Sequence, residues 1–287
     1  MPEMPEVESL RTFLAPRCVG AAIVRIDLAA FSALKTYDPP PSALYGLEID
    51  AIERHGKFLA IGAQGLWLVF HLARAGWLRW KEEQPQRPGR PGRGPLTARV
   101  VLDSGAGFDL TEAGTQRKLA IYVVRHPSDV PGVATLGPDP LADDFDAAAL
   151  DAILAKAGRA QLKGVLRDQR IVAGIGNAYS DEILHAAKLS PFKPASGLSP
   201  RERVALLAAI KGELQDAIER SAGLAASDLK GEKKSGLRVH GRAGEPCEVC
   251  GTTIAEVSFA DSSLQYCPGC QTGGKPLADR RMSRLLK

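Results

Sequence analysis

The spacing of hydrophobic residues predicts a helix followed by a β-rich region. Val7, Leu10 and Leu14 recur at helical spacing near the start of the chain. They predict a short amphipathic helix over residues 5–14. From about residue 20 to 125, apolar and polar residues instead alternate in short runs between Gly- and Pro-rich turns, at residues 23–26, 47–50, 58–61, 66–72, 100–102 and 119–124. This alternation predicts an antiparallel sandwich or barrel.

Beyond residue 141 the pattern becomes helical. Apolar residues recur every three or four positions over residues 145–157, 161–168, 178–188 and 199–221. Residues 222–236 are rich in Ala, Ser, Gly and Lys, so we expect a flexible loop that leads to a small terminal module. These changes predict three domains, over residues 1–131, 132–236 and 237–287.

A segment rich in proline and arginine interrupts the strand pattern at residues 84–95. Its prolines are Pro85, Pro88, Pro91 and Pro95, and its arginines are Arg87, Arg90 and Arg93. Proline lacks the N–H group that a sheet requires, so this segment is expected to form a mobile loop. We favour a solvated spacer over a phosphate-binding segment.

The composition is that of an ordinary globular protein. With 287 residues, 45% hydrophobic and 24% charged, the chain is neither a mini-protein nor a disordered or collagen-like one. No apolar run approaches the length of a membrane span and the start is acidic, so we expect a soluble, cytoplasmic protein. The net charge of +4 favours a polyanionic partner over a basic one.

Four of the five cysteines form two CxxC pairs, Cys247 with Cys250 and Cys267 with Cys270, and only Cys18 stands apart. The 16 residues between the pairs fit two zinc-binding turns on a β-hairpin. Four thiolates complete a tetrahedral site and leave no position open for water. We therefore expect one structural Zn²⁺ and not a catalytic metal.

A turn that contains glycines separates two helical segments at residues 168–179. Gly174 and Gly176 permit a close backbone approach, and Asn177 stands where the next helix begins. Free N–H groups at a helix start can bind phosphate. The same residues also fit a plain helix–helix turn with Asn as its N-cap, so this motif alone does not indicate nucleic-acid binding.

The start of the chain offers a possible nucleophile. Removal of Met1 would leave Pro2 with a free secondary amine beside the Glu3 carboxylate. A terminal amine has a pKa of about 8, so it is partly neutral and nucleophilic at physiological pH. Its attack on an aldehyde-like carbon gives an iminium cation, which accepts electrons. Taken alone, a polar tail is the simpler interpretation of these residues.

Together these motifs resemble the formamidopyrimidine-DNA glycosylase and endonuclease VIII family, and they are most similar to the formamidopyrimidine-DNA glycosylase branch. The matching segments are the start at residues 1–8, the lysine-bearing strand at 55–59, the segment at 136–141, the helix-two-turn-helix core at 168–182 and the zinc finger at 240–270. The resemblance implies an α+β fold with several domains: an N-terminal helix with an antiparallel β-sandwich, a helix-two-turn-helix domain and a C-terminal four-cysteine zinc finger.

The resemblance also implies base excision repair by a DNA glycosylase with AP lyase activity. Such an enzyme flips a damaged nucleotide out of duplex DNA, breaks its glycosidic bond and nicks the strand by β,δ-elimination. Pro2 would attack C1′ of the sugar, and Glu3 would protonate the sugar ring oxygen. Lys57 would hold a phosphate beside the lesion, while Lys163 and Asn177 would contact the DNA backbone. We expect a nucleoid-associated monomer that acts on double-stranded DNA and favours oxidised purines over abasic sites alone.

Several positions depart from the family pattern. Ser262 stands where the family usually carries an arginine that binds the phosphates beside the lesion. Arg74 occupies the place of a methionine that fills the space left by the flipped base, and Arg117 lies in a second wedge region that lacks its aromatic residue. Residues 222–236 do not match the loop that closes over an oxidised purine, and His240 replaces a tyrosine.

These departures leave two alternatives open. The first keeps the enzyme but shifts its substrate to oxidised pyrimidines or to abasic sites alone. The second is a protein that binds damaged DNA without cutting it. The basic tail at residues 280–287 is expected to be solvated in every case.

Overall fold

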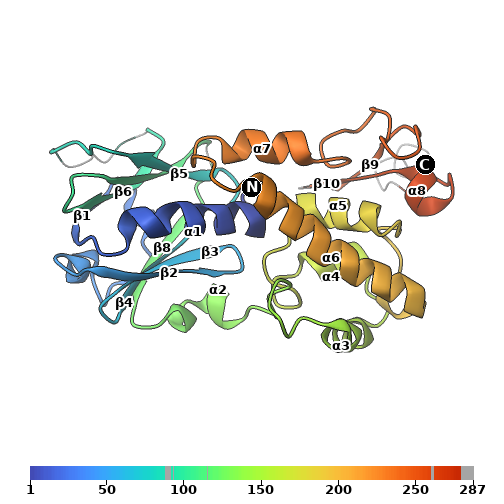
Figure 1. The fold of residues 1–287 in the computed structure, drawn as a ribbon, viewed down its shortest axis with the longest axis horizontal. Helices are drawn as coiled ribbons and strands as arrows, with labels where there is room; N and C mark the ends of the chain where they lie inside the picture. The colour runs from blue at the N-terminus through green and yellow to red at the C-terminus, as the bar shows by residue number, and fades with distance from the viewer. Residues whose placement is uncertain (88–91, 93, 115, 260–261, 279–287) are drawn as a thin grey trace. The chain divides into compact units, whose positions relative to one another are not determined.

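The computed structural model describes residues 1–87, 92, 94–114, 116–259 and 262–278. It forms two compact units (Figure 1). Unit 1 comprises Met1–Leu136 and Arg220–Glu232, and unit 2 comprises Gly137–Glu219 and Lys233–Lys287. The chain thus returns to unit 1 before it ends in unit 2. The three domains expected from the sequence do not coincide with these units, and they stay a prediction.

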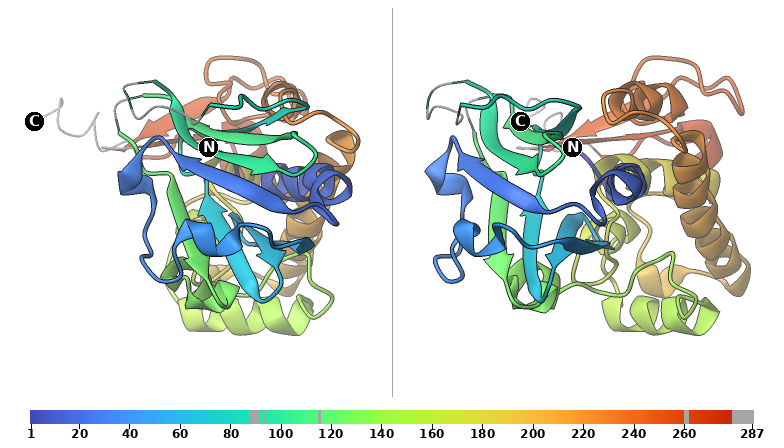
Figure 2. Two further views of the ribbon diagram at one scale, coloured as in Figure 1. Left: turned by 90° about the vertical axis from the view of Figure 1, so that its left-hand side faces the viewer. Right: turned by 60° about the vertical axis from the view of Figure 1, so that its left-hand side comes forward.

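Unit 1 contains one long helix and two antiparallel four-stranded sheets, which Figure 2 turns toward the viewer. Helix α1 spans Met4–Cys18, and the short helix α2 spans Pro131–Ala134. One sheet has the order β1-β6-β7-β5, with strands Ile23–Leu28, Leu96–Leu102, Gly107–Glu112 and Gly76–Lys81. The other has the order β2-β3-β4-β8, with strands Ile49–His55, Phe58–Ala63, Leu66–His71 and Ala120–Val124. The predicted β-sandwich is confirmed.

The core of unit 1 joins both sheets to helix α1. Leu10 and Leu14 of α1 are fully buried in the same cluster as Phe70 of β4 and Phe108 of β7. The apolar residues whose spacing predicted α1 are therefore the residues that the helix buries in the core. Side chains of this size each contribute roughly 1.5–3 kcal/mol through burial.

Strands β5 and β7 were not predicted, although apolar and polar residues alternate over residues 108–111 of β7. Every residue of β7 is buried, including the charged Asp109. Arg99 of β6 donates two hydrogen bonds to Asp109, at 2.8 and 3.1 Å, and Lys81 of β5 lies 2.9 Å from the same carboxylate. Burial alone would raise the pKa of Asp109, but these bonds lower it overall. The ion pair therefore allows a charged residue in a fully buried strand.

The first residues of the proline- and arginine-rich segment are held by hydrogen bonds to β1 and to a neighbouring turn. Arg25 donates to the carbonyl oxygens of Pro85 and Gln86, at 2.8 and 3.0 Å. The Gln84 N–H donates to the carbonyl of Gly105. The later members of this segment, residues 88–91 and 93, lie outside the described residues, as does the tail at 280–287.

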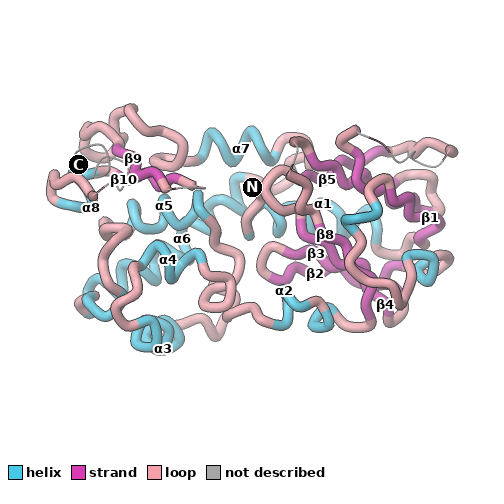
Figure 3. The backbone as a smooth tube through the Cα atoms, turned by 180° about the vertical axis from the view of Figure 1, so that it is seen from behind, coloured by secondary structure: helices cyan, strands magenta, loops and turns pink. Residues whose placement is uncertain are grey.

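Unit 2 contains the predicted helices and a small hairpin (Figures 1 and 3). The helices are α3 (Ala147–Ala157), α4 (Leu162–Arg167), α5 (Asn177–Ala186), α6 (Pro200–Arg220), which crosses into unit 1 at its last residue, and α8 (Pro268–Thr272). Strands β9 (Ala255–Ser258) and β10 (Ser263–Tyr266) form the hairpin, which lies beside α5. Asp146 caps α3 by accepting from the Ala149 N–H. Short 3₁₀ helices span Phe31–Ala33, Pro41–Leu44, Pro127–Asp129 and Ala195–Gly197 in the two units.

The segment at residues 222–236 is not the flexible loop that its composition predicts. Its second half forms helix α7, Leu229–Gly236, and Ala226 and Leu229 are buried in the core of unit 1. Trp77 of β5 donates its ring N–H to the Ala226 carbonyl at 2.9 Å, and the Lys230 ammonium lies 4.7 Å from the centre of the Trp77 ring. The expectation of a flexible loop was therefore wrong. The segment is ordered because a lysine can cover an aromatic face while its charge stays near water.

No helix within the described ranges is long and apolar enough to cross a membrane.

Candidate functional site

The start of unit 1 holds Pro2 and Glu3 in a fixed position. Both residues are buried, whereas Met1 is exposed. Glu3 is the N-cap of α1, and its N–H donates to the Glu6 carboxylate at 2.7 Å within a reciprocal capping box. The Val7 N–H adds a bond to the Glu3 carbonyl at 3.1 Å. The local sequence therefore fixes the backbone on which the predicted nucleophile and acid stand.

Lys57 lies in the turn between β2 and β3 and is 7% exposed. The preceding Gly56 has a φ of +56°, a value that favours glycine. His71, at the end of β4, pairs in register with Phe58, and the two rings are 4.7 Å apart. Burial, followed by the charge of Lys57, lowers the pKa of His71 to about 4. His71 therefore stays neutral near pH 7, so the positive charge at this place belongs to Lys57.

His71 was not selected from the sequence, although it lies three positions before Arg74 in the same motif. Its Nδ1 accepts a hydrogen bond from the Ala73 N–H at 3.2 Å, which assigns the ring proton to Nε2. A lone histidine at a strand end does not indicate a function in the sequence. Its proximity to Lys57 follows from the pairing of β3 with β4, which the sequence does not show.

Arg74 and Arg117 are both exposed on turns of unit 1. Arg74 stands in the turn that the Gly76 N–H closes by donating to the Leu72 carbonyl at 2.9 Å. Arg117 donates to the Gly94 carbonyl at 2.8 Å. Both guanidinium groups therefore lie on the surface, as a contact with DNA requires.

Lys163 of α4 is buried and holds the start of α5. Its ammonium donates to the Asn177 carbonyl at 3.0 Å, to Ser180 Oγ at 2.9 Å and to Asp181 Oδ1 at 2.6 Å. Lys163 is only 5% exposed. These three bonds match the three ammonium hydrogens, so the geometry gives Lys163 a positioning role, and its predicted DNA contact stays a prediction.

Asn177 begins helix α5 and is half-buried. Its side-chain Nδ2 donates to the Ser263 carbonyl of β10 at 2.7 Å, and its Oδ1 is buried without a hydrogen-bond partner among the described residues. Gln169 braces the preceding turn, because it accepts from the Gly174 N–H and donates to the Ile175 carbonyl. Sequence reasoning selected Asn177 but missed Gln169.

Two acidic residues of α5 hold the segment that enters the zinc module. Asp181 Oδ2 accepts from His240 Nδ1 at 2.7 Å and from the Gln265 N–H at 3.2 Å. Glu182 accepts the backbone N–H groups of residues 238–240, at 2.8 to 3.0 Å. Burial raises the pKa of Glu182, and these backbone bonds offset part of the effect. His240, noted from the sequence as a departure, is thus a partner of Asp181.

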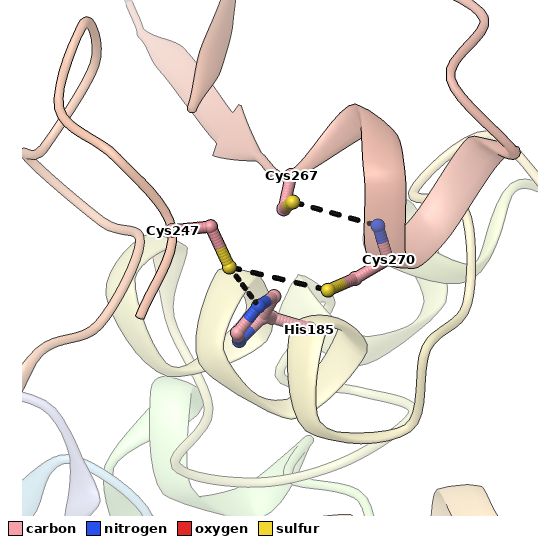
Figure 4. Close-up of side chains that lie close together, drawn as sticks. All are labelled: His185, Cys247, Cys267 and Cys270. Carbon is pink, nitrogen blue, oxygen red and sulfur yellow. Dashed lines mark hydrogen bonds between the residues drawn. The ribbon is translucent and has the colours of Figure 1, made fainter. Parts of the chain in front are cut away.

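The C-terminal cysteines come together beside α5, and Figure 4 shows Cys247, Cys267 and Cys270 with His185. The Sγ atoms of Cys247 and Cys270 are 3.9 Å apart, and those of Cys250 and Cys267 are 3.3 Å apart. A tetrahedral zinc with bonds of about 2.3 Å separates its sulfur ligands by about 3.8 Å. The two CxxC turns therefore fit a structural Zn²⁺ that would join them, and the Sγ atoms of Cys247, Cys267 and Cys270 lie with a ring nitrogen of His185 within 4.8 Å of one another. Nε2 of His185 lies 3.3 Å from the Sγ of Cys247.

Family models match the two units in three places. The formamidopyrimidine-DNA glycosylase N-terminal domain matches residues 1–119, and the H2TH domain of the same glycosylase matches residues 136–228. The chain belongs to the formamidopyrimidine-DNA glycosylase family. The model described as a zinc finger found in FPG and IleRS matches residues 244–273, and it confirms the structural zinc. The chain is thus a member of a family of DNA glycosylases that act in base excision repair of damaged bases.

Two named relatives and a solved structure are similar to this chain. A formamidopyrimidine-DNA glycosylase from Symbiobacterium thermophilum is 37% identical over 98% of this chain and 93% of its own. An uncharacterized formamidopyrimidine-DNA glycosylase-like protein from Mycobacterium tuberculosis is 58% identical over 55% of this chain and 98% of its own. The crystal structure of the MutM (Fpg) protein from Thermus thermophilus has a TM-score of 0.79 at 29% identity, over 96% of this chain and 100% of that one.

The family and the multidomain α+β fold expected from the sequence are confirmed. The roles of individual residues stay predictions, namely those of Pro2, Glu3, Lys57, Arg74, Arg117, Lys163 and Asn177. Within each unit the structure brings some of them together: Pro2 with Glu3 in unit 1, and Lys163 with Asn177 in unit 2.

Proposed function

We propose that this chain is a bifunctional DNA glycosylase and AP lyase that acts on double-stranded DNA with damaged bases or abasic sites. The observation that carries the proposal is the capped start of α1, where Pro2 and Glu3 are buried side by side in a chain of this family. A solved relative, Fpg from Lactococcus lactis, is described in complex with DNA that contains an abasic site. That structure covers 94% of this chain with a TM-score of 0.82 at 27% identity.

The chemistry follows from a secondary amine next to a carboxylic acid. After removal of Met1, the Pro2 nitrogen attacks C1′ and loses its proton, while the base leaves with the electron pair of the glycosidic bond and takes up a proton from water. Glu3 then protonates the sugar ring oxygen, and the C1′–O4′ bond breaks as the nitrogen lone pair forms the C=N bond of the iminium. The iminium between Pro2 and C1′ acidifies the hydrogen on C2′. Loss of that proton expels the 3′ phosphate, and a second elimination expels the 5′ phosphate. Water then hydrolyses the iminium and restores the free amine.

Other residues of the proposed site bind DNA. Lys57 supplies the positive charge for a phosphate beside the lesion, since the neighbouring His71 stays neutral. Arg74 and Arg117 lie on exposed turns, from which a guanidinium can stack on bases. Asn177 contacts the DNA backbone, and Lys163 holds its carbonyl in place.

Borohydride trapping tests the lyase. Borohydride reduces the iminium to a stable amine, so mature protein mixed with a duplex containing one abasic site should gain the mass of a DNA strand in intact-mass spectrometry. The same spectrum reports whether Met1 has been removed. Protein that lacks Met1 and gains no mass would refute the assignment of Pro2.

Two variants separate the roles of the amine and the acid. Pro2→Gly should reduce trapping on abasic DNA, because a secondary amine forms the iminium directly. Glu3→Gln should slow release of a damaged base more than it slows trapping on an abasic site. Equal losses in both assays would contradict the assignment of Glu3 as the acid.

Oxidised purines are the substrate class that we favour. Solved relatives are described in complexes with DNA that contains carbocyclic 8-oxo-G or FAPY-dG, and one with an oxidised pyrimidine. A panel of duplexes with one lesion each ranks oxidised purines, oxidised pyrimidines and abasic sites. Faster excision of an oxidised pyrimidine would refute the preference for purines while leaving the glycosylase intact.

A second candidate function is binding of damaged DNA without cutting. The observation that favours it is Ser262 in the place of the family's phosphate-binding arginine. Salt-sensitive binding to abasic DNA, with no nicked strand and no trapped adduct after long incubation, would support this function over the lyase.

A further inference from the structure

Helix α5 faces the zinc module with polar residues spaced four positions apart. Asn177 donates to the Ser263 carbonyl, Asp181 accepts from His240 Nδ1 and the Gln265 N–H, and His185 contacts Cys247. Residues at this spacing lie above one another on one face of a helix. The helix therefore contacts the module at its start, in its middle and near its end.

We propose that His185 is a positioning residue of the zinc centre, which donates its Nε2–H to the thiolate of Cys247. The two atoms are 3.3 Å apart, and both residues are buried, His185 with 4% exposure and Cys247 with 2% (Figure 4). A zinc-bound thiolate carries negative charge and accepts hydrogen bonds. An N–H that points at its sulfur supports the ligand from outside the metal shell.

The burial of His185 argues that this bond has a role. A buried polar group without a hydrogen bond destabilises a protein, so a buried imidazole normally has partners. The Nδ1 of His185 has none among the residues that the structure describes. The contact with Cys247 is therefore the bond on which the ring depends, and it assigns the proton to Nε2.

The spacing of the two CxxC pairs assigns the four thiolates as the metal ligands, and structural zinc sites have four ligands. A ring nitrogen of His185 and the Sγ atoms of Cys247, Cys267 and Cys270 all lie within 4.8 Å of one another, so the imidazole is the group that a test must separate from Cys250. The imidazole then lies outside the four ligands and against one of them.

This bond links the zinc to the start of α5. His185 and Asn177 lie on the same ten-residue helix, which α4 supports through Lys163. Loss of the metal or of the donor should loosen α5 and weaken the contact between Asn177 and Ser263. The inference rests on the zinc site alone, so it stands even if the proposed lyase activity fails.

Nitrogen NMR of the zinc-loaded protein, labelled at histidine, tests the assignment without any substitution. We expect the His185 ring to be neutral, with a proton on Nε2 and none on Nδ1. A proton on Nδ1 with Nε2 bound to the metal would make His185 a ligand and overturn the proposal.

Chelator competition measures the effect on the metal. Replacing an outer partner of a metal ligand typically weakens metal binding by about 10- to 100-fold. His185→Phe keeps a ring but removes the donor, and we expect zinc affinity to fall by about 10-fold or more. His185→Gln places an amide N–H near the position of Nε2 and should restore most of the affinity. Equal affinities for wild type and His185→Phe would overturn the proposal.

Cobalt substitution provides a second readout of the ligand set. The charge-transfer absorption of Co²⁺ depends on the number of bound thiolates. We expect it to be similar in wild type, His185→Phe and His185→Gln, and to fall in Cys250→Ser. A Cys250→Ser protein with the wild-type spectrum would show that Cys250 is not a ligand, and would overturn the assignment.

Discussion

Replacing the buried Lys163 with methionine tests whether this residue positions α5 or serves only to bind DNA. Methionine keeps the length of the side chain but removes the charge and the three donors. The fully buried Asp181 would then keep His240 and the Gln265 N–H as partners among the described residues. The Asn177 carbonyl and Ser180 Oγ would each lose one bond.

The expected loss of stability is large. Removing one partner of a buried ion pair costs about 3–5 kcal/mol, because the remaining charge stays in a poorly solvated site. Unit 2 has about 140 residues, so each kcal/mol corresponds to a change in Tm of about 3–4 °C. We therefore expect the Tm of unit 2 to fall by about 10–20 °C. If Lys163 served only to bind DNA, its replacement would change the stability of the free protein by about 0.5 kcal/mol or less.

Calorimetry of the zinc-loaded protein, with zinc release followed by a chelating dye, reports the unfolding of unit 2. Lys156→Met, on the exposed side of α3, is the matched control, and we expect it to change stability by about 0.5 kcal/mol or less. In the double variant Lys163→Met with Asp181→Asn, removal of the stranded charge should recover at least about 1 kcal/mol. A loss below about 1 kcal/mol for Lys163→Met alone would refute the positioning role.

Three further predictions concern the turn that carries Arg74, the histidine beside Lys57 and the zinc-finger hairpin. Gly76→Ala should destabilise unit 1 by about 3 kcal/mol or more, since a Cβ would lie 2.0 Å from the Leu72 carbonyl oxygen; Gly94→Ala, which meets nothing within 4 Å, is the control in urea unfolding, and equal effects would contradict the prediction. Because His71 stays neutral to about pH 4 when folded but takes up a proton below about pH 6.5 when unfolded, it should remove stability as the pH falls through this window, by at most about 3 kcal/mol. His71→Leu should flatten the acid side of the stability curve, and an unchanged slope would refute the shifted pKa. Ser262→Arg adds a phosphate-binding group, so the slope of log K against log salt should steepen by about 1 in DNA titrations; an unchanged slope would mean that the new arginine does not reach the DNA.

Apolar spacing predicted α1 and the strands β2, β3 and β4. The apolar residues of α1 and the spaced buried residues of β2 fit elements with one solvated face, whereas β3 and β4 bury continuous runs of residues. Strand β7 has no such contrast because its polar residues are buried too, and Asp109 is tolerated there only through Arg99 and Lys81. No local pattern reveals this pairing, because it depends on the order β6-β7-β5 in the sheet.

The lysine-rich composition of helix α7 led to the wrong prediction of a flexible loop. Lys230, Lys233 and Lys234 look like the composition of a solvated loop. In the structure Leu229 is buried, and the ammonium groups of Lys230 and Lys233 lie 4.7 and 4.6 Å from the ring centres of Trp77 and Tyr179. Lysine stems can pack on aromatic faces, so a lysine-rich segment becomes ordered when such faces are near. Those faces come from β5 and α5, which are distant in sequence.

The zinc site and its surroundings differ in how far the sequence could predict them. Two CxxC turns have a characteristic spacing, so the sequence alone predicted a structural zinc. The partners of α5 in the zinc module lie 56 to 86 positions away in the sequence, and a buried polar network is stable only when each member has its partners. This requirement accounts for His240, whose Nδ1 reaches a carboxylate that Lys163 also binds, and it extends to His185, whose Nε2 reaches a zinc ligand. Two histidines without an evident role in the sequence thus connect helix α5 to the zinc module. His240 binds Asp181 of α5, and His185 of α5 contacts the sulfur of Cys247.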